Sequence, residues 1–227
     1  MNKYSSEGVY SMTKRAVIFD LDGTLVNSIP FHLRIHRNVL SEFGIHFTNE
    51  FFETKCNGSK PEEFYKTIFK HYKGTSRGYK TALKQYYKER ASSDVRTIKT
   101  FSGVKTMMKR LHEAGYQIAV ATSSTNEYAE LLLDANTIRQ YVHEIVGGNE
   151  VERTKPDPHI FLLARKELGI RKADCVVVED AINGVKAARR AKIDCLCMLT
   201  SEKREDIPEY ATVVEKHSML FDVIENM

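Results

Sequence analysis

The 227-residue sequence has no tryptophan, only five prolines and four cysteines, and no long apolar segment. No apolar run approaches the ~20 residues that a membrane-spanning helix requires, so we expect no membrane partner. None of the cysteines forms a Cys-x-x-Cys pair, and we expect reduced thiols. The first 12 residues contain no apolar signal-peptide core. These absences together predict a cytoplasmic protein.

A strong excess of charge of one sign is also lacking. The chain has 34 Lys and Arg against 30 Asp and Glu, which gives a net charge of +4 at pH 7. This balance is too mild to indicate a dedicated nucleic-acid or membrane-surface protein. Hydrophobic residues make up 42% of the sequence, enough for the core of one large domain or of one domain with an insertion. A mostly disordered chain is therefore excluded.

Short β-rich apolar runs recur along the chain, and amphipathic helical stretches separate most of them. The runs are apolar at consecutive positions, which is typical of strands buried on both faces of a sheet. Strands that alternate with helices predict a parallel sheet. We therefore predict an α/β fold with a doubly wound, Rossmann-like core. The expected strands are 16–19, 118–121, 144–146, 175–178, 195–199 and 211–214.

One interval interrupts this alternation because it contains no strand signal and is expected to form several helices. Apolar and aromatic residues recur in it at helical spacing, which predicts a small helical bundle. The two stripes are Phe64, Ile68 and Tyr72, and then Tyr79, Ala82, Leu83, Tyr86 and Tyr87.

The bundle is expected to be an all-helical cap inserted into the core. The predicted division is a polar tail at 1–13, a catalytic core at 14–27 and 95–227, and the cap at 28–94. Residues 51–90 hold ten Lys or Arg and four Asp or Glu, so the positive charge is concentrated in the insertion.

The first predicted strand runs directly into Asp20-Leu21-Asp22-Gly23-Thr24. Side chains two residues apart in extended backbone lie on one side, so both carboxylates project together from the carboxyl end of the strand. Such a pair needs a cation, and a hard divalent ion such as Mg2+ takes oxygen ligands and attracts phosphate. An isolated Asp-x-Asp-Gly also occurs in ordinary turns, so this motif alone does not decide the function.

Three further polar signals follow later predicted strands. Thr122-Ser123 offers hydroxyls and backbone N–H groups that suit a phosphate oxygen. Lys155 stands just before a predicted helix, and Glu179-Asp180 ends a buried strand. Helix capping or a solvated surface charge explains each signal taken singly. Because all of them fall at the carboxyl edge of one doubly wound sheet, where such folds bind ligands, a shared site is the better explanation.

The ordered motifs closely resemble those of the haloacid dehalogenase superfamily of phosphotransferases. They are Asp20-x-Asp22-Gly23-Thr24, Thr122, Lys155-Pro156 and Glu179-Asp180. The flanking segments FDLDGTLVNS, TKPDPHIF and VVVEDAINGVKAA resemble the beta-phosphoglucomutase-like branch in particular. The resemblance covers nearly the whole chain from about Arg15, including a helical cap after the first strand.

This resemblance implies a chemical role for the residues of the first motif. Asp20 would be the nucleophile that attacks phosphorus and becomes an aspartyl-phosphate. Asp22 would protonate the leaving oxygen and then deprotonate the water that hydrolyses the intermediate. Thr24 would steady the Asp22 carboxylate.

The resemblance also implies a cofactor and a set of ligands. Mg2+ would be held by Asp20, the backbone carbonyl of Asp22 and Asp180, with Glu179 in a supporting position. Preorganised positive charge at the transferring phosphoryl group lowers the barrier. The residues expected to bind the phosphoryl oxygens are Thr122, Ser123 and Lys155.

Substrate choice is expected to lie in the cap. In the mutase branch, a histidine near the start of the first cap helix and a cation in a Gly-x-Lys/Arg loop face the substrate, and His32 and Lys60 stand at the matching positions. An ordinary helix residue and a surface charge are the respective alternatives. Mutases also hold a second phosphate with a lysine after the Thr/Ser cluster, where this chain has Thr125 followed by Asn126. Asn126 is our third candidate substrate contact, and the missing lysine favours hydrolysis.

We therefore predict a Mg2+-dependent phosphatase that hydrolyses a small phosphomonoester, for example a sugar phosphate, through an aspartyl-phosphate. A sugar-phosphate mutase is the alternative. A nucleic-acid-binding module is a third hypothesis, because residues 51–90 interleave nine aromatics among ten basic residues. Most of those aromatics fall on helical stripes, which favours burial. The expected partner is thus a small phosphorylated metabolite and no nucleic acid, and the expected assembly is a monomer.

Overall fold

The computed structural model describes residues 14–55, 61–73 and 76–227. Its centre is a parallel sheet of six strands in the order β3-β2-β1-β4-β5-β6. The strands are β1 (Ala16–Phe19), β2 (Gln117–Ala121), β3 (Glu144–Val146), β4 (Cys175–Glu179), β5 (Asp194–Met198) and β6 (Thr212–Val214). All six predicted strands are confirmed, with boundaries within one residue of those expected.

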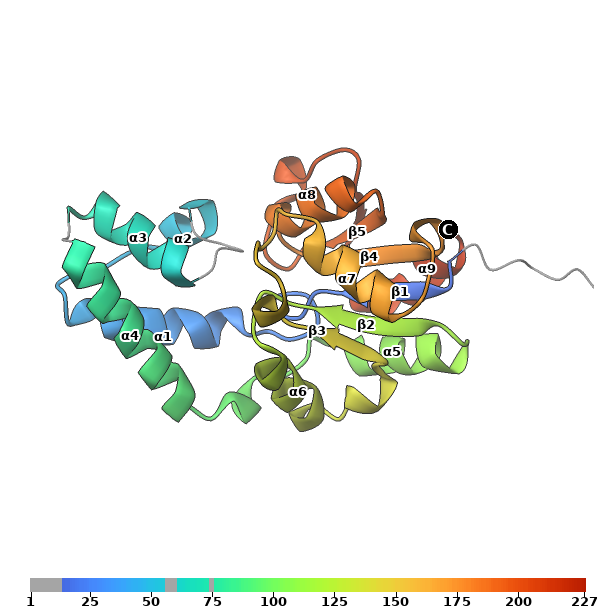
Figure 1. The fold of residues 1–227 in the computed structure, drawn as a ribbon, viewed down its shortest axis with the longest axis horizontal. Coiled ribbons are helices and arrows are strands. Elements are labelled where there is room, and N and C mark those ends of the chain that lie inside the picture. The colour runs from blue at the N-terminus through green and yellow to red at the C-terminus, as the bar shows by residue number, and fades with distance from the viewer. Residues whose placement is uncertain (1–13, 56–60, 74–75) are drawn as a thin grey trace, which may run out of the picture.

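Helices cover both faces of this sheet (Figure 1). Helices α5 (Val104–Glu113), α6 (Asn126–Ala135) and α9 (His217–Glu225) share one hydrophobic cluster, and α7 (His159–Glu167) and α8 (Ile182–Ala191) share another. Alternate strand residues enter opposite clusters, as Val17 and Ile18 of β1 do. Because the central strands β1 and β4 are buried at every position, their runs had to be apolar at consecutive positions. The predicted doubly wound α/β core is confirmed.

Between β1 and α5 the described part of the chain forms the four helices α1 to α4, and we call them the cap. They are α1 (Ile29–Ser41), α2 (Asn49–Lys55), α3 (Pro61–His71) and α4 (Ser76–Ser92). Figure 1 shows them grouped together at one end of the core. The described part of this interval contains no strand, in agreement with the helical character that the sequence predicts.

The aromatic stripes build the interior of the cap in part. The stripe residues that are buried as expected are Phe64, Ile68, Ala82 and Tyr86. The prediction is wrong for Tyr72 and Tyr87, which are 38% and 48% exposed. Tyr72 follows the last residue of α3, and Tyr87 borders the cavity described below. Four of the nine aromatic side chains at 51–90 are buried and only Tyr72 and Tyr87 are exposed, which leaves few ring faces on which bases could stack and disfavours the nucleic-acid alternative.

Two sequence predictions fall outside the described residues, namely the polar tail at 1–13 and Lys60. Among the residues that the structure describes, no helix combines the length and the apolar character needed to cross a membrane.

Candidate active site

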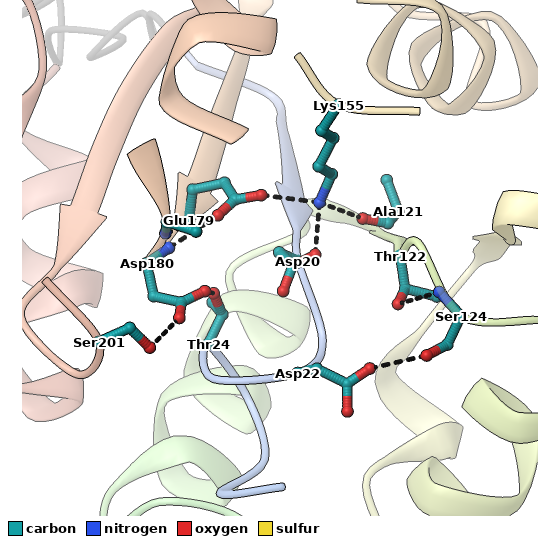
Figure 2. A network of polar contacts seen from close by, with 11 residues as sticks. Asp20, Asp22, Thr24, Ala121, Thr122, Ser124, Lys155, Glu179, Asp180 and Ser201 are labelled. Carbon is teal, nitrogen blue, oxygen red and sulfur yellow. Dashed lines mark hydrogen bonds and ion pairs between the residues drawn. The ribbon is translucent and has the colours of Figure 1, made fainter. Parts of the chain in front are cut away.

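Acidic residues from two neighbouring strands meet at the carboxyl edge of the sheet (Figure 2). Asp20 directly follows β1, and Glu179 and Asp180 stand at the end of β4. Because β1 and β4 pair in parallel with Phe19 opposite Val178, both strands end at the same level. One carboxylate oxygen from each of the three acids lies within 4.8 Å of the others. The structure therefore brings together three acids that the sequence motifs singled out.

A single buried ammonium group lies among these acids. Lys155 Nζ donates hydrogen bonds to Asp20 Oδ1, to Glu179 Oε1 over 2.7 Å, and to the carbonyl oxygen of Ala121 over 3.1 Å. One ammonium beside three buried carboxylates leaves excess negative charge where water cannot screen it. A hard divalent cation with oxygen ligands would offset that excess, so the donor set fits Mg2+.

The acid pKa values reflect the same imbalance. Burial raises the pKa of Asp20 well above its usual range, with Lys155 opposing the shift and the charges of Glu179 and Asp180 adding to it. Burial, followed by the charge of Glu179, raises the pKa of Asp180 to about 7. Without a further positive charge, both carboxyl groups therefore ionise less readily than usual, which again favours a cation at this cluster.

The Asp180 carboxylate is held on both oxygens. Thr24 Oγ1 donates to Asp180 Oδ1 over 2.8 Å, and Ser201 Oγ donates to Oδ2. The prediction that Thr24 steadies Asp22 is therefore wrong. The chain turns at Gly23, whose φ is +90°, and this turn directs the Thr24 hydroxyl toward the end of β4. Sequence analysis missed Ser201, and only its place after β5 marks it.

Asp22 lies apart from the three-acid cluster and faces the cap. Its Oδ2 accepts a hydrogen bond from Ser124 Oγ over 2.9 Å, and its Oδ1 lies 3.6 Å from His32 Nε2 and 3.5 Å from the Tyr128 hydroxyl. Burial favours the neutral carboxyl, but the hydrogen bond and charge of His32 outweigh it and lower the pKa of Asp22 to about 2. The two aspartates of the motif therefore occupy different electrostatic environments. Tyr128 was missed because no motif surrounds it.

A cavity of about 360 Å³ opens over these groups, between the core and the cap. On the core side it is lined by the predicted catalytic, phosphate-binding and metal-binding residues, namely Asp20, Asp22, Thr122, Ser123, Lys155 and Asp180. Thr122 is buried at the end of β2, and its Oγ1 accepts a hydrogen bond from the Ser124 N–H over 3.1 Å. A phosphate-sized ligand in this cavity would meet hydroxyl groups and an ammonium group on one wall.

The structure places the residues predicted to contact the substrate on its cap side in different positions. His32 of α1 lines the cavity, and its ring lies between a cap tyrosine and a core tyrosine: Nδ1 is 3.3 Å from the Tyr86 hydroxyl and Nε2 is 3.0 Å from the Tyr128 hydroxyl. Asn126 is on the core helix α6 and does not line the cavity. Its side-chain amide donates to Glu150 Oε1 over 2.7 Å, so the structure places this side chain beside Glu150 and not at the cavity.

Comparison with known proteins agrees with this geometry. A sequence model described as haloacid dehalogenase-like hydrolase matches residues 17–198. The chain is 30% identical over 195 residues to the chloroplastic protein SUPPRESSOR OF QUENCHING 1 of Arabidopsis thaliana, a match that covers 82% of this chain but only 18% of that protein.

Two bacterial relatives match over most of their own length. A beta-phosphoglucomutase of Bacillus subtilis is 29% identical over 184 residues, with 78% of this chain and 80% of the relative covered. A fructose-1-phosphate phosphatase of Escherichia coli is 29% identical, with 79% of this chain and 94% of the relative covered. Among solved structures, CbbY of Rhodobacter sphaeroides in complex with phosphate has a TM-score of 0.75 at 23% identity, covering 91% of this chain and 96% of that one. This likeness shows the shared fold.

Proposed function

The chain belongs to the haloacid dehalogenase-like hydrolase family, and from this membership we propose that it is a Mg2+-dependent phosphatase. Like the phosphatases to which it is similar, it is a phosphoric monoester hydrolase. The proposed substrate is a small phosphomonoester, for example a sugar phosphate. The observation that carries the proposal is the cluster of Asp20, Glu179 and Asp180 beside Lys155, at the floor of a cavity large enough for a small metabolite.

In the first step, a carboxylate oxygen of Asp20 attacks phosphorus. A bond forms between that oxygen and phosphorus, the ester P–O bond breaks, and the leaving oxygen takes a proton from Asp22. Lys155 supports the ionised form of Asp20 by its direct contact with Oδ1. A bound phosphate dianion would raise the pKa of Asp22 from about 2, because a nearby negative charge favours the protonated carboxyl.

In the second step, Asp22 removes a proton from water while the water oxygen attacks phosphorus of the aspartyl-phosphate. The bond between phosphorus and Asp20 breaks, and inorganic phosphate leaves. The ionised form of Asp22 suits this step, since Ser124 and His32 favour its charge. The alternation of one carboxyl group between acid and base thus serves both halves of the reaction.

The chain's own residues also provide for the cofactor and the phosphoryl oxygens. Asp20, the backbone carbonyl of Asp22 and Asp180 would hold Mg2+, which when bound neutralises charge on the phosphoryl group. Thr24 and Ser201 fix the orientation of the Asp180 carboxylate. The residues proposed to bind the phosphoryl oxygens are Thr122, Ser123 and Lys155.

A sugar-phosphate mutase is the second candidate, and similarity to the Bacillus subtilis beta-phosphoglucomutase favours it. Thr125 stands where mutases of this branch carry a lysine, which supports hydrolysis instead. Incubation of beta-glucose 1-phosphate with a trace of the bisphosphate separates the two activities. A mutase would form glucose 6-phosphate faster than free phosphate, and a phosphatase would not.

The test of the proposal is phosphate release from p-nitrophenyl phosphate. We expect turnover that requires Mg2+, is lost on chelation and disappears in Asp20→Asn. Asp134→Asn, at an exposed position of α6, is the matched control and should retain activity. Unchanged turnover in Asp20→Asn would contradict the proposal.

A further inference from the structure

The two walls of the cavity differ in chemistry. The core wall carries hydroxyls, carboxylates and the Lys155 ammonium group. The cap wall carries several aromatic rings, and its only nitrogen-bearing side chains among the described residues are His32, His36 and Arg90. Because the phosphoryl group must lie against the core wall, the cap wall is left to meet the leaving group.

The two cap histidines are engaged within the protein. His32 contacts the hydroxyls of Tyr86 and Tyr128 through its two ring nitrogens, at 3.3 and 3.0 Å. His36 lies 3.3 Å from the Tyr65 hydroxyl through Nδ1 and stacks on Tyr86, with ring centroids 4.4 Å apart and an interplanar angle of 11°. These contacts engage both ring nitrogens of His32 and one ring nitrogen of His36.

Arg90 is engaged as well. Its guanidinium lies over the Tyr128 ring, 4.0 Å from the centroid, and donates to Ser124 Oγ over 3.4 Å. Both partners belong to the core, so this side chain joins the end of α4 to the core beside the cavity. The Tyr128 ring thus covers one face of the guanidinium.

Among the described residues, ring faces and aliphatic groups make up much of the rest of the cap wall. Phe52 of α2 and Tyr87 of α4 line the cavity, together with Ile29 and Pro61. Tyr87 is 48% exposed although it lies in the middle of a cap helix, and Phe52 is only partly buried. Large aromatic surfaces that a fold leaves accessible beside a polar centre mark a place where apolar ligand surface binds.

We infer that the natural substrate is a phosphomonoester whose leaving group carries a flat aromatic ring, and that Phe52 and Tyr87 determine this specificity. The inference narrows, and rests on, the phosphatase function proposed above. A polyhydroxylated leaving group packed on the ring faces of Phe52 and Tyr87 would lose water from hydroxyls that those faces cannot replace with hydrogen bonds. An aromatic ring would instead bury its faces against the two side chains.

The test compares substrates that differ only in the ring. Adenosine 5'-monophosphate and ribose 5-phosphate share the phosphate-bearing carbon and the sugar, and benzyl and cyclohexylmethyl phosphate share a primary phosphate-bearing carbon and ring size. We expect kcat/KM to be at least tenfold higher for the aromatic member of one pair or both. A ratio near 1 in both pairs, or a preference for the other member, would overturn the inference.

Two variants assign the preference to the cap wall. Phe52→Leu and Tyr87→Leu keep apolar bulk but remove a ring, and each should bring the ratio several-fold closer to 1. Tyr87 is half exposed, so its variant stays informative if Phe52→Leu fails to fold. Tyr72→Leu removes another exposed cap tyrosine that does not line the cavity, and it should leave the ratio unchanged. If the kcat/KM ratio is unchanged in both single variants, Tyr87→Leu and Phe52→Leu, the assignment of the preference to these two rings is refuted.

The outcomes also separate this inference from the proposed function. Mg2+-dependent turnover of p-nitrophenyl phosphate that is lost in Asp20→Asn, combined with no aromatic preference, would overturn the inference and keep the phosphatase. Lack of turnover with every phosphomonoester would refute both.

Discussion

Thr24 Oγ1 donates a hydrogen bond to Asp180 Oδ1 over 2.8 Å, so the loop after β1 holds a carboxylate that follows β4. Ser201, from the loop after β5, binds the other oxygen of that carboxylate. Two loops that are distant in the sequence thus fix the carboxylate of Asp180. Groups that orient a metal ligand contribute to affinity for the metal without contacting it.

Removal of the Thr24 hydroxyl should therefore weaken Mg2+ binding. In Thr24→Val, which keeps the side-chain shape, we expect the Mg2+ concentration for half-maximal activity to rise about tenfold. A titration of activity with Mg2+ measures this. Thr212→Val, at an exposed position of β6, is the control and should titrate like the parent. The same Mg2+ requirement in Thr24→Val and the parent would refute the orienting role.

Gly23 has a positive φ, and it also leaves room for the Asp180 carboxylate that a larger residue would occupy. A Cβ at Gly23 would lie 2.2 Å from Asp180 Oδ2, whereas a Cβ at Gly44 would meet nothing within 4 Å. Both glycines have positive φ, so alanine at either site should cost about 1 kcal/mol of stability. We expect only Gly23→Ala to lose most of its Mg2+-dependent activity. Phosphate release by the two folded variants checks this, and equal activities would contradict the clash.

Lys155 should stabilise the fold in a pH-dependent way. Lys155→Met leaves Asp20 and Glu179 buried without their ammonium partner, which should cost about 3–5 kcal/mol. Burial already raises the pKa of Asp20, and without Lys155 less opposes that rise. A carboxyl group whose pKa is higher in the folded than in the unfolded state lowers the free energy of unfolding as the pH rises. The destabilisation caused by Lys155→Met should therefore be larger at pH 8 than at pH 5.

Urea unfolding of Lys155→Met at the two pH values measures this difference. Lys172→Met, at an exposed position, should match the parent at both. A loss that is the same at pH 5 and pH 8 would show that charge burial is not its cause.

His36 should make the fold sensitive to acid. Burial, together with the charges of His32 and Arg90, lowers the pKa of His36 well below its usual range. The unfolded chain therefore takes up a proton below about pH 6.5 that the folded cap resists, and stability falls by up to ~1.4 kcal/mol per pH unit. His36→Phe should reduce this slope. Denaturation midpoints at pH 7.5 and 5.5 test it against His46→Phe, an exposed control whose slope should match the parent.

The fold could be predicted from the sequence because its physical signals are local. Strands buried on both faces must be apolar at every position, and the acids at 20, 179 and 180 each follow such a run. Parallel pairing then places these strand ends at one edge, so the three-acid cluster followed from the order of elements alone.

Contacts set by single dihedral angles or by distant loops could not be predicted in this way. The partner of Thr24 depends on the turn at Gly23, and Ser201 reaches Asp180 only because β5 lies beside β4. Asn126 is held by Glu150, 24 residues further along the chain. Helical periodicity placed Tyr87 on a buried stripe, but it cannot show that the neighbouring space is a cavity.

The register of β1 against β4 decides whether the cation site can form. Phe19 lies opposite Val178, and this alignment sets the level at which Asp20 and Asp180 face each other. An offset of one residue would send one of the two carboxylates to the opposite side of the sheet. Only correctly aligned molecules would then retain a complete cation site. Calorimetric titration with Mg2+ would therefore count the fraction of a preparation whose central strands are in register.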